Sequence, residues 1–264
     1  MRADGPGWPA SDGELVELQH RLARDAAAVL ASDPWTPPAD PVVGGCFVAF
    51  GRGQAGPGQP GDRAWAAAVA WRPGTAPPDA GRPVDRHLRG AAGDGSPRRA
   101  DDVVAQSVVS RRVAAGYVPG LLALREGPVL GDAVAGLPVR PDVLLVDATG
   151  LDHPRGAGLA LHLGAVAGLP TVGVTQRPLV ATGDPPEPRR GAAAPLRLGG
   201  RCVGHLVCTR TGSRAVVAHA GWRTTPETAA RTVLGASTPS ARTPVPLQEA
   251  RRVAREARAI AERR

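Results

Sequence analysis

The 264-residue chain has no lysine and no asparagine, and it has one isoleucine, one tyrosine and two phenylalanines. All 32 basic residues are therefore arginine, against 24 acidic residues. This composition is typical of a GC-rich genome, which replaces residues whose codons are rich in A and T. The net charge of +8 fits a polyanionic partner such as nucleic acid, but the codon bias explains the charge equally well.

Cysteine is also scarce, with three in the chain and no CxxC pair. Cys202 and Cys208, if they lie on one strand, would be about 20 Å apart, too far to form a disulfide. This usage indicates a reducing, cytoplasmic environment and no zinc site. Residues 1–14 lack the apolar core of a signal peptide. No apolar run approaches the ~20 residues of a membrane span, so we expect neither a leader nor a membrane partner.

The 34 glycines and 28 prolines are clustered rather than spread along the chain. Low-complexity loops are predicted where they concentrate, at residues 51–63, 73–101 and 182–200. Residues 73–101 show no apolar periodicity and combine five prolines, five glycines and five arginines. We expect this segment to be mobile and dispensable, because a change in loop length costs little stability.

Apolar periodicity predicts a series of helices and strands between these loops. Helices are predicted at 14–31, 119–130, 154–167, from the capping box at 224–227, and from residue 247; strands are predicted at 42–50, 64–72, 102–113, 142–147, 170–175, 202–209 and 213–219. Three consecutive strands followed by alternating helices and strands favour a mixed sheet with helices on both faces. This order is compatible with a ribonuclease-H-like fold.

Four short motifs follow one another in the middle of the chain: YVPG at 117–120, RE at 125–126, DVLLVD at 142–147, and HPR at 153–155 followed by HLG at 162–164. Together they resemble the central motifs of endonuclease V, a family of nucleases that cut nucleic acid near inosine. RTPVPLQEA at 242–250 resembles that family's tail, R-x-P-x-P-T-R-x-A-D. The resemblance covers residues 14–262 as one endonuclease V-like domain, apart from the low-complexity loops.

The resemblance implies a nucleic-acid-binding surface. In the family, the turn matched by Tyr117, Pro119 and Gly120 inserts beside the lesion, and its tyrosine replaces lost base stacking. Base–aromatic stacking contributes about 1–3 kcal/mol. Tyr117 is the one tyrosine of the chain, which favours this role over that of a core residue. The motif of His153 and Arg155 implies that backbone N–H groups at the start of a helix bind a flipped base or a phosphate.

The resemblance also implies a catalytic metal site. Glu126 and Asp147 match two carboxylates of the family, and Asp147 closes a predicted central strand, where such folds place catalysts. Two converging carboxylates can hold Mg²⁺, which would activate water. The alternative to a metal site is that Glu126 caps a helix and Asp147 lies in a turn, so that the two residues share no function.

Three other family positions carry residues that cannot do the family's chemistry. Phe47 occupies the position of the aspartate that the family has in its first strand. If the alignment is shifted by one residue, Cys46 occupies that position, and it is not a carboxylate either. Gln176 occupies the position of a lysine in the family, and Trp222 occupies the position of a histidine. We therefore expect weak Mg²⁺ binding and impaired cleavage. Three nearby groups are candidates to replace a lost ligand, although none aligns: Asp40, Asp152 and His219.

Three functions remain open at this stage. The first is a repair protein that acts on inosine-containing or damaged DNA or RNA, with an incomplete metal site. The second is an active Mg²⁺-dependent endonuclease V with a rebuilt site. The third is an interaction protein that keeps the fold without nucleic acid. For each we expect a cytoplasmic monomer.

Overall fold

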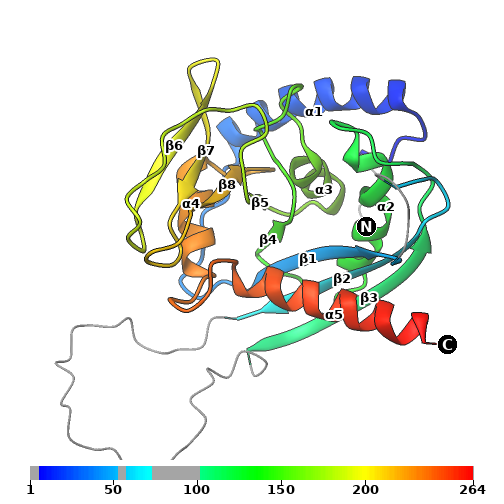
Figure 1. The fold of residues 1–264 in the computed structure, drawn as a ribbon. Coiled ribbons are helices and arrows are strands. Elements are labelled where there is room, and N and C mark those ends of the chain that lie inside the picture. The colour runs from blue at the N-terminus through cyan, green and yellow to red at the C-terminus, as the bar shows by residue number, and fades with distance from the viewer. Residues whose placement is uncertain (1–5, 53–57, 73–101, 264) are drawn as a thin grey trace, which may run out of the picture.

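The computed structural model describes residues 6–52, 58–72 and 102–263 (Figure 1). The loop predicted at 73–101 lies outside the described residues, as does part of the one at 51–63. In chain order, the elements are α1 (Asp12–Ser32), β1 (Val43–Phe50), β2 (Arg63–Trp71), β3 (Val103–Arg112), α2 (Leu122–Ala135), β4 (Val143–Val146), α3 (Leu159–Ala167), β5 (Thr171–Thr175), β6 (Ala193–Leu198), β7 (Arg201–Val207), β8 (Val216–Ala220), α4 (Pro226–Gly235) and α5 (Val245–Glu262).

The strands form one eight-stranded sheet in the order β3-β2-β1-β4-β5-β8-β7-β6. The three central strands β1, β4 and β5 are parallel, and the flanking pairs are antiparallel. The predicted mixed sheet is therefore confirmed. Because the parallel strands are covered on both faces, their residues are almost continuously apolar, as in β4, where all four side chains are buried.

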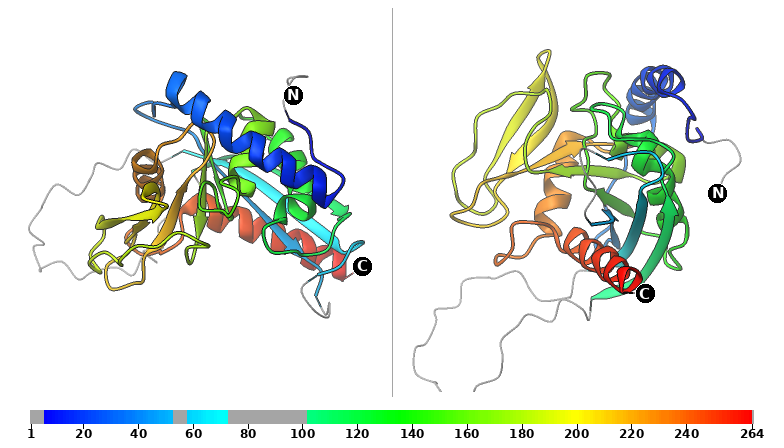
Figure 2. Two further views of the ribbon diagram at one scale, coloured as in Figure 1. Left: turned by 90° about the horizontal axis from the view of Figure 1, so that it is seen from above. Right: turned by 45° about the vertical axis from the view of Figure 1, so that its right-hand side comes forward.

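Helices cover both faces of the sheet (Figure 2). On one face α2 and α3 pack over a core that includes Leu124, Val146 and Leu163, and α1 lies outside α3 through Leu18, Leu22 and Leu161. On the other face α4 and α5 pack over β1, β2, β7 and β8. Among the described residues, no helix has the length and apolar character needed to cross a membrane.

Two predictions are corrected. The segment 182–200 was expected to be a loop, but it contains β6, which pairs with β7 at the edge of the sheet. An edge strand tolerates Pro195 because a missing N–H there removes no bond of a central ladder. The helix expected from residue 119 begins instead at Leu122, because residues 118–121 close a turn in which Leu121 N–H donates to the carbonyl of Val118 at 3.0 Å.

The close packing of α5 on β1 depends on Gly45. A Cβ atom at Gly45 would lie 2.4 Å from the backbone carbonyl carbon and oxygen of Pro246, a distance at which the helix would have to move. The glycine thus lets the first turn of α5 sit directly on β1. This contact fixes the path of α5 past the end of β4.

Candidate functional site

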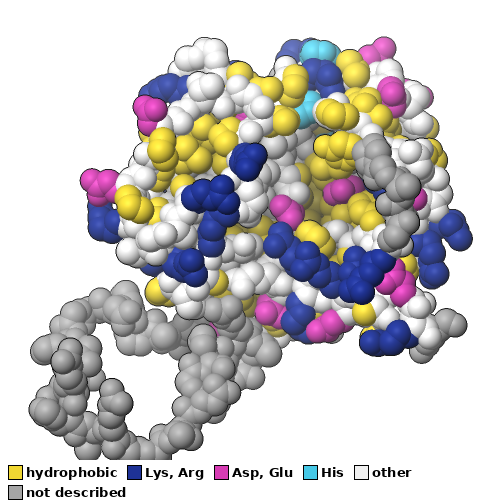
Figure 3. All heavy atoms as spheres, in the orientation of Figure 1, with side chains coloured by type: hydrophobic (Ala, Val, Ile, Leu, Met, Phe, Trp, Pro, Cys, Tyr) yellow, Lys and Arg dark blue, Asp and Glu magenta, His cyan; other side chains and the backbone are white. Residues whose placement is uncertain are grey.

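A cavity of about 220 Å³ opens beside the carboxyl ends of β4 and β5. Ligands of open α/β sheets characteristically bind at this edge. Its lining includes residues of the predicted nucleic-acid-binding surface and one carboxylate of the predicted metal site. These are Tyr117, Pro119, Gly120, His153 and Asp147, together with Thr175. Figure 3 shows a hollow with apolar and acidic side chains, with basic side chains along the position of α5.

The turn that carries Tyr117 is tightly built. Pro119 and Gly120 occupy its two central positions, and Gly120 has φ +80°, the backbone conformation that favours glycine in a type II turn. The Gly120 carbonyl accepts hydrogen bonds from Gln19 Nε2 at 3.2 Å, His153 Nε2 at 3.2 Å and Arg155 Nη2 at 2.7 Å. The structure thus brings the YVPG and HPR motifs together, and it leaves Tyr117 44% exposed.

His153 works in this turn as a neutral hydrogen-bond donor. Its burial, together with the charge of Arg155, lowers its pKa to about 4. The Arg155 backbone N–H donates to His153 Nδ1 at 3.2 Å, so the ring proton is on Nε2, which faces the Gly120 carbonyl. The imidazole therefore holds the turn and carries no charge near neutral pH.

Glu126 and Asp147 are close enough to interact electrostatically. Loss of hydration raises the pKa of Glu126 to about 8, with a further contribution from the negative charge of Asp147 and a smaller opposing one from Arg125. Arg125 itself is buried and serves the fold: it forms an ion pair with Asp62 at 2.6 Å and lies over the Phe50 ring at 4.1 Å. Near neutral pH the Glu126 carboxyl is therefore mostly protonated.

Adjacent residues of β1 face opposite sides of the sheet. Cys46 is fully buried on the α2 side; burial first, and then the charges of Asp147 and Glu126, raise the pKa of its thiol far above the usual range. Phe47 packs on the α5 side, where its ring centroid lies 5.0 Å from the guanidinium carbon of Arg251. A neutral thiol and a phenyl ring thus stand where the family motif has a carboxylate.

Arg251 is a site residue that the sequence analysis missed. It lies on α5, and its Nη2 donates to Asp147 Oδ2 at 2.9 Å. Arg251 directly follows Ala250, so it occupies the position of the final aspartate in the family motif R-x-P-x-P-T-R-x-A-D. That departure was visible in the sequence, but an arginine on an Arg-rich helix looks like part of a solvated face. In the structure it places a fixed positive charge on the carboxylate expected to hold a metal.

The remaining predicted positions do not belong to the lining of this cavity. Gln176 accepts a hydrogen bond from Arg242. Trp222 packs beneath α1 with Leu151 and Ala157, and a Cβ atom added at Gly164 would lie 2.5 Å from the Cβ of Trp222. Asp40 lies on the surface, 4.0 Å from Arg72.

Asp152 and His219 form a buried polar network that reaches the cavity wall. Asp152 accepts three backbone N–H bonds at 2.8–2.9 Å, from Leu179, Val180 and Ala181. His219 Nδ1 lies 3.5 Å from Asp152 Oδ2, and its Nε2 lies 2.7 Å from Thr175 Oγ1. Burial lowers the pKa of His219 to about 4, against the opposing charge of Asp152. Thr175 is the one member of this trio in the cavity lining.

Comparisons with known proteins agree with this architecture. The family model described as Endonuclease V matches residues 97–252, a stretch that excludes β1 with Cys46 and Phe47. A protein named Endonuclease V from Streptomyces coelicolor is 35% identical over 217 residues, 82% of this chain and 78% of that protein.

Solved structures show the same fold. The crystal structure of Endonuclease V from Streptomyces avermitilis has a TM-score of 0.76 and 32% identity, covering 97% of this chain and 96% of the other. Endonuclease V from Ciona intestinalis, solved with a 24-mer DNA containing an inosine followed by a ribo-adenosine, has a TM-score of 0.66 at 16% identity, covering 94% of this chain and 98% of the other. The ribonuclease-H-like α/β fold predicted from the sequence is thereby confirmed.

Proposed function

Because the chain belongs to the endonuclease V family, we propose that it is a nucleic-acid repair protein that recognises inosine-containing or damaged DNA or RNA but cleaves it weakly or not at all. The observation that carries this proposal is the ion pair between Arg251 and Asp147. It places a positive charge of the protein itself on the carboxylate that the family motif assigns to a metal.

Recognition is supported by the built geometry of the Tyr117 turn. The exposed Tyr117 side chain lies beside the cavity. The turn that follows it is held by three hydrogen bonds to the Gly120 carbonyl. An aromatic ring on a rigid turn suits insertion into a base stack. The structural neighbour from Ciona was solved with inosine-containing DNA, and we extend this class of ligand to the present chain.

The donor set around Asp147 does not fit a magnesium ion. Mg²⁺ prefers charged oxygen ligands and gives up its water reluctantly. Here a buried cysteine, Cys46, and the phenyl ring of Phe47 supply no charged oxygen from β1, and Arg251 donates to Asp147 and adds a positive charge. We therefore derive no metal-dependent step for this chain. Gln176 and Trp222 also supply neither the positive charge nor the general base that the matched lysine and histidine would offer.

The test is a Mg²⁺ titration with an inosine-containing duplex in which binding and cleavage are measured separately. We expect binding with a preference over the matched adenine duplex, and little or no product. Robust Mg²⁺-dependent cutting by the wild-type chain, abolished by Asp147→Ala, would refute the proposal. As a gain-of-function arm, Phe47→Asp combined with Arg251→Asp returns two carboxylates to the Asp147 side and should raise cleavage above the wild-type level.

The Thr175–His219–Asp152 network favours one second candidate, an active enzyme with a rebuilt site. Thr175 lines the same cavity as Asp147, and its hydroxyl lies 2.7 Å from His219 Nε2 while it donates to the Arg177 carbonyl at 2.7 Å. Activation of this hydroxyl by the histidine would require its proton to turn from the Arg177 carbonyl to His219. Cleavage that is lost in Thr175→Val, a change that keeps side-chain shape and removes the hydroxyl, would favour this candidate. Unchanged cleavage in Thr175→Val would leave the network a purely structural role.

A further inference from the structure

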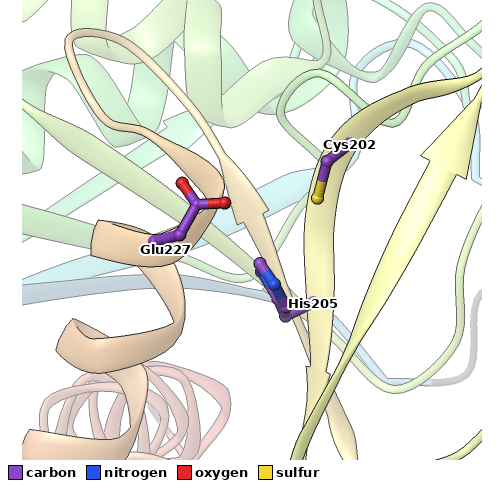
Figure 4. A group of neighbouring side chains, drawn as sticks. All are labelled: Cys202, His205 and Glu227. Atoms are coloured by element: carbon purple, nitrogen blue, oxygen red, sulfur yellow. The ribbon is translucent and has the colours of Figure 1, made fainter.

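Three side chains of metal-ligand type meet on the β7–α4 side of the protein, apart from the cavity at Asp147. One ligand atom each from Cys202, His205 and Glu227 lies within 4.8 Å of the other two (Figure 4). Cys202 and His205 belong to β7, and Glu227 to the first turn of α4. In the sheet β7 is separated from β5 by β8, so this cluster takes no part in the lining described above.

An irregularity of β7 puts Cys202 and His205 on one face. Residues three apart on a regular strand point to opposite faces. Here Leu196 pairs with Gly204 and Arg197 pairs with Cys202, so that Val203 is an extra residue and the alternation is reset, as in a β-bulge. Val203 and Leu206 consequently share the apolar cluster on the other face. The bulge turns the C-x-x-H spacing into a pair of converging side chains.

A hydrogen bond to α4 fixes the tautomer of the His205 imidazole. Its Nδ1 lies 3.2 Å from the carbonyl oxygen of Pro226. A carbonyl can only accept, so this bond places the ring proton on Nδ1 and leaves the lone pair of Nε2 available. Metal-bound histidines commonly donate their second ring N–H in this way, which fixes the ring and its tautomer. Pro226 precedes Glu227, so the same turn of α4 orients one ligand and supplies another.

Glu227 has the freedom to act as a ligand. It is exposed, and within the part of the chain that the structure describes its carboxylate has no hydrogen bond or ion pair. Cys202 and His205 are partly buried, which shields the site on one side and leaves it open on the side of Glu227.

We propose that Cys202, His205 and Glu227 form a binding site for a zinc-class divalent cation, with water as the fourth ligand. Thiolate, imidazole and carboxylate are the protein ligands of Zn²⁺, at about 2.0–2.3 Å from the ion, whereas Mg²⁺ avoids sulfur. Ligand atoms of a tetrahedral zinc site are roughly 3.3–3.8 Å apart by that geometry, so the cluster needs to contract by about an ångström. The bound ion would fasten β7 to α4.

The test is a Co²⁺ titration of the reduced full-length chain, followed by its thiolate-to-cobalt charge-transfer absorption, with Zn²⁺ and Mg²⁺ as competitors. We expect one cobalt per chain, displaced by Zn²⁺ and not by Mg²⁺. Binding should release a proton as the Cys202 thiol becomes a thiolate, and it should raise the melting temperature, because the ion binds the folded chain.

Variants assign the ligands. Cys202→Ser should abolish the charge-transfer band, while Cys208→Ser, which changes a buried cysteine directly after β7, should keep it. Glu227→Gln is a surface change that folding tolerates, and it should lower the apparent affinity more than about 10-fold. A band that survives Cys202→Ser, or wild-type affinity in Glu227→Gln, would overturn the proposal. So would an absence of cobalt binding at one equivalent. None of these results bears on inosine recognition or on Asp147.

Discussion

Replacing Glu126 by glutamine should change how stability depends on pH. The raised pKa of Glu126, about 8 against an ordinary value of 4.5, means that the folded protein holds a proton that the unfolded chain releases. Below pH 4.5 both states are protonated, and the folded state bears no penalty. Between pH 4.5 and pH 8 the contribution of Glu126 to the stability of the wild type falls as pH rises, and above pH 8 its full penalty is present.

The size of the effect follows from the shift. One pKa unit corresponds to about 1.4 kcal/mol, so the penalty should reach about 3 kcal/mol near pH 7 and at most about 5 kcal/mol above pH 8. Glutamine keeps the shape of the protonated carboxyl and never ionises. The Glu126→Gln variant should therefore match the wild type near pH 4.5 and be more stable than it above pH 8.

The assay is urea unfolding of both proteins at about five pH values, with Glu17→Gln, an exposed change on α1, as the matched control. The difference in free energy of unfolding between Glu126→Gln and wild type should grow as pH rises, whereas the difference between the Glu17→Gln control and wild type should stay constant. Parallel curves for all three proteins would refute the assigned environment of Glu126. A Mg²⁺-induced stabilisation of the wild type at pH 8.5 that Glu126→Gln lacks would show that the carboxylates bind the ion after all.

Three further predictions concern other parts of the chain. Tyr117→Ala should weaken binding to an inosine-containing duplex by about 1–3 kcal/mol in fluorescence anisotropy, and an equal loss on an unmodified duplex would mean that Tyr117 serves folding. Deletion of residues 76–98 should leave soluble expression and melting temperature unchanged; insoluble protein would show that the segment is structural. Gly45→Ala should lower the free energy of unfolding by about 1–3 kcal/mol through overpacking against Pro246, and an unchanged urea midpoint would contradict the close contact.

The architecture could be predicted from the sequence because its central strands are continuous apolar runs between clear breaks. Residues 142–147 differ from the observed β4 by one residue at each end. The edge strand β6 was missed because its single proline and its glycine neighbours look like loop sequence. Such a strand is recognised by its pairing with β7, which is a long-range contact that local composition does not encode.

Sequence motifs named candidate site residues one by one, but they did not encode the contacts between distant residues. The motifs named Tyr117, His153 and Arg155 one by one, and the structure adds that His153 and Arg155 hold the turn after Tyr117 through the Gly120 carbonyl. Arg251 was missed because its partner, Asp147, is 104 residues away. The Cys202–His205 pair was missed because a bulge reverses the strand alternation, and no residue type marks that bulge in the sequence.

The three hydrogen bonds to the Gly120 carbonyl have a consequence for the kinetics and thermodynamics of recognition. The donors come from α1 and from the segment before α3, so the loss of conformational entropy in this loop has already occurred during folding. A ligand that meets Tyr117 therefore finds a preorganised group and retains most of the contact energy as affinity. Association should therefore proceed as near rigid-body docking on the protein side.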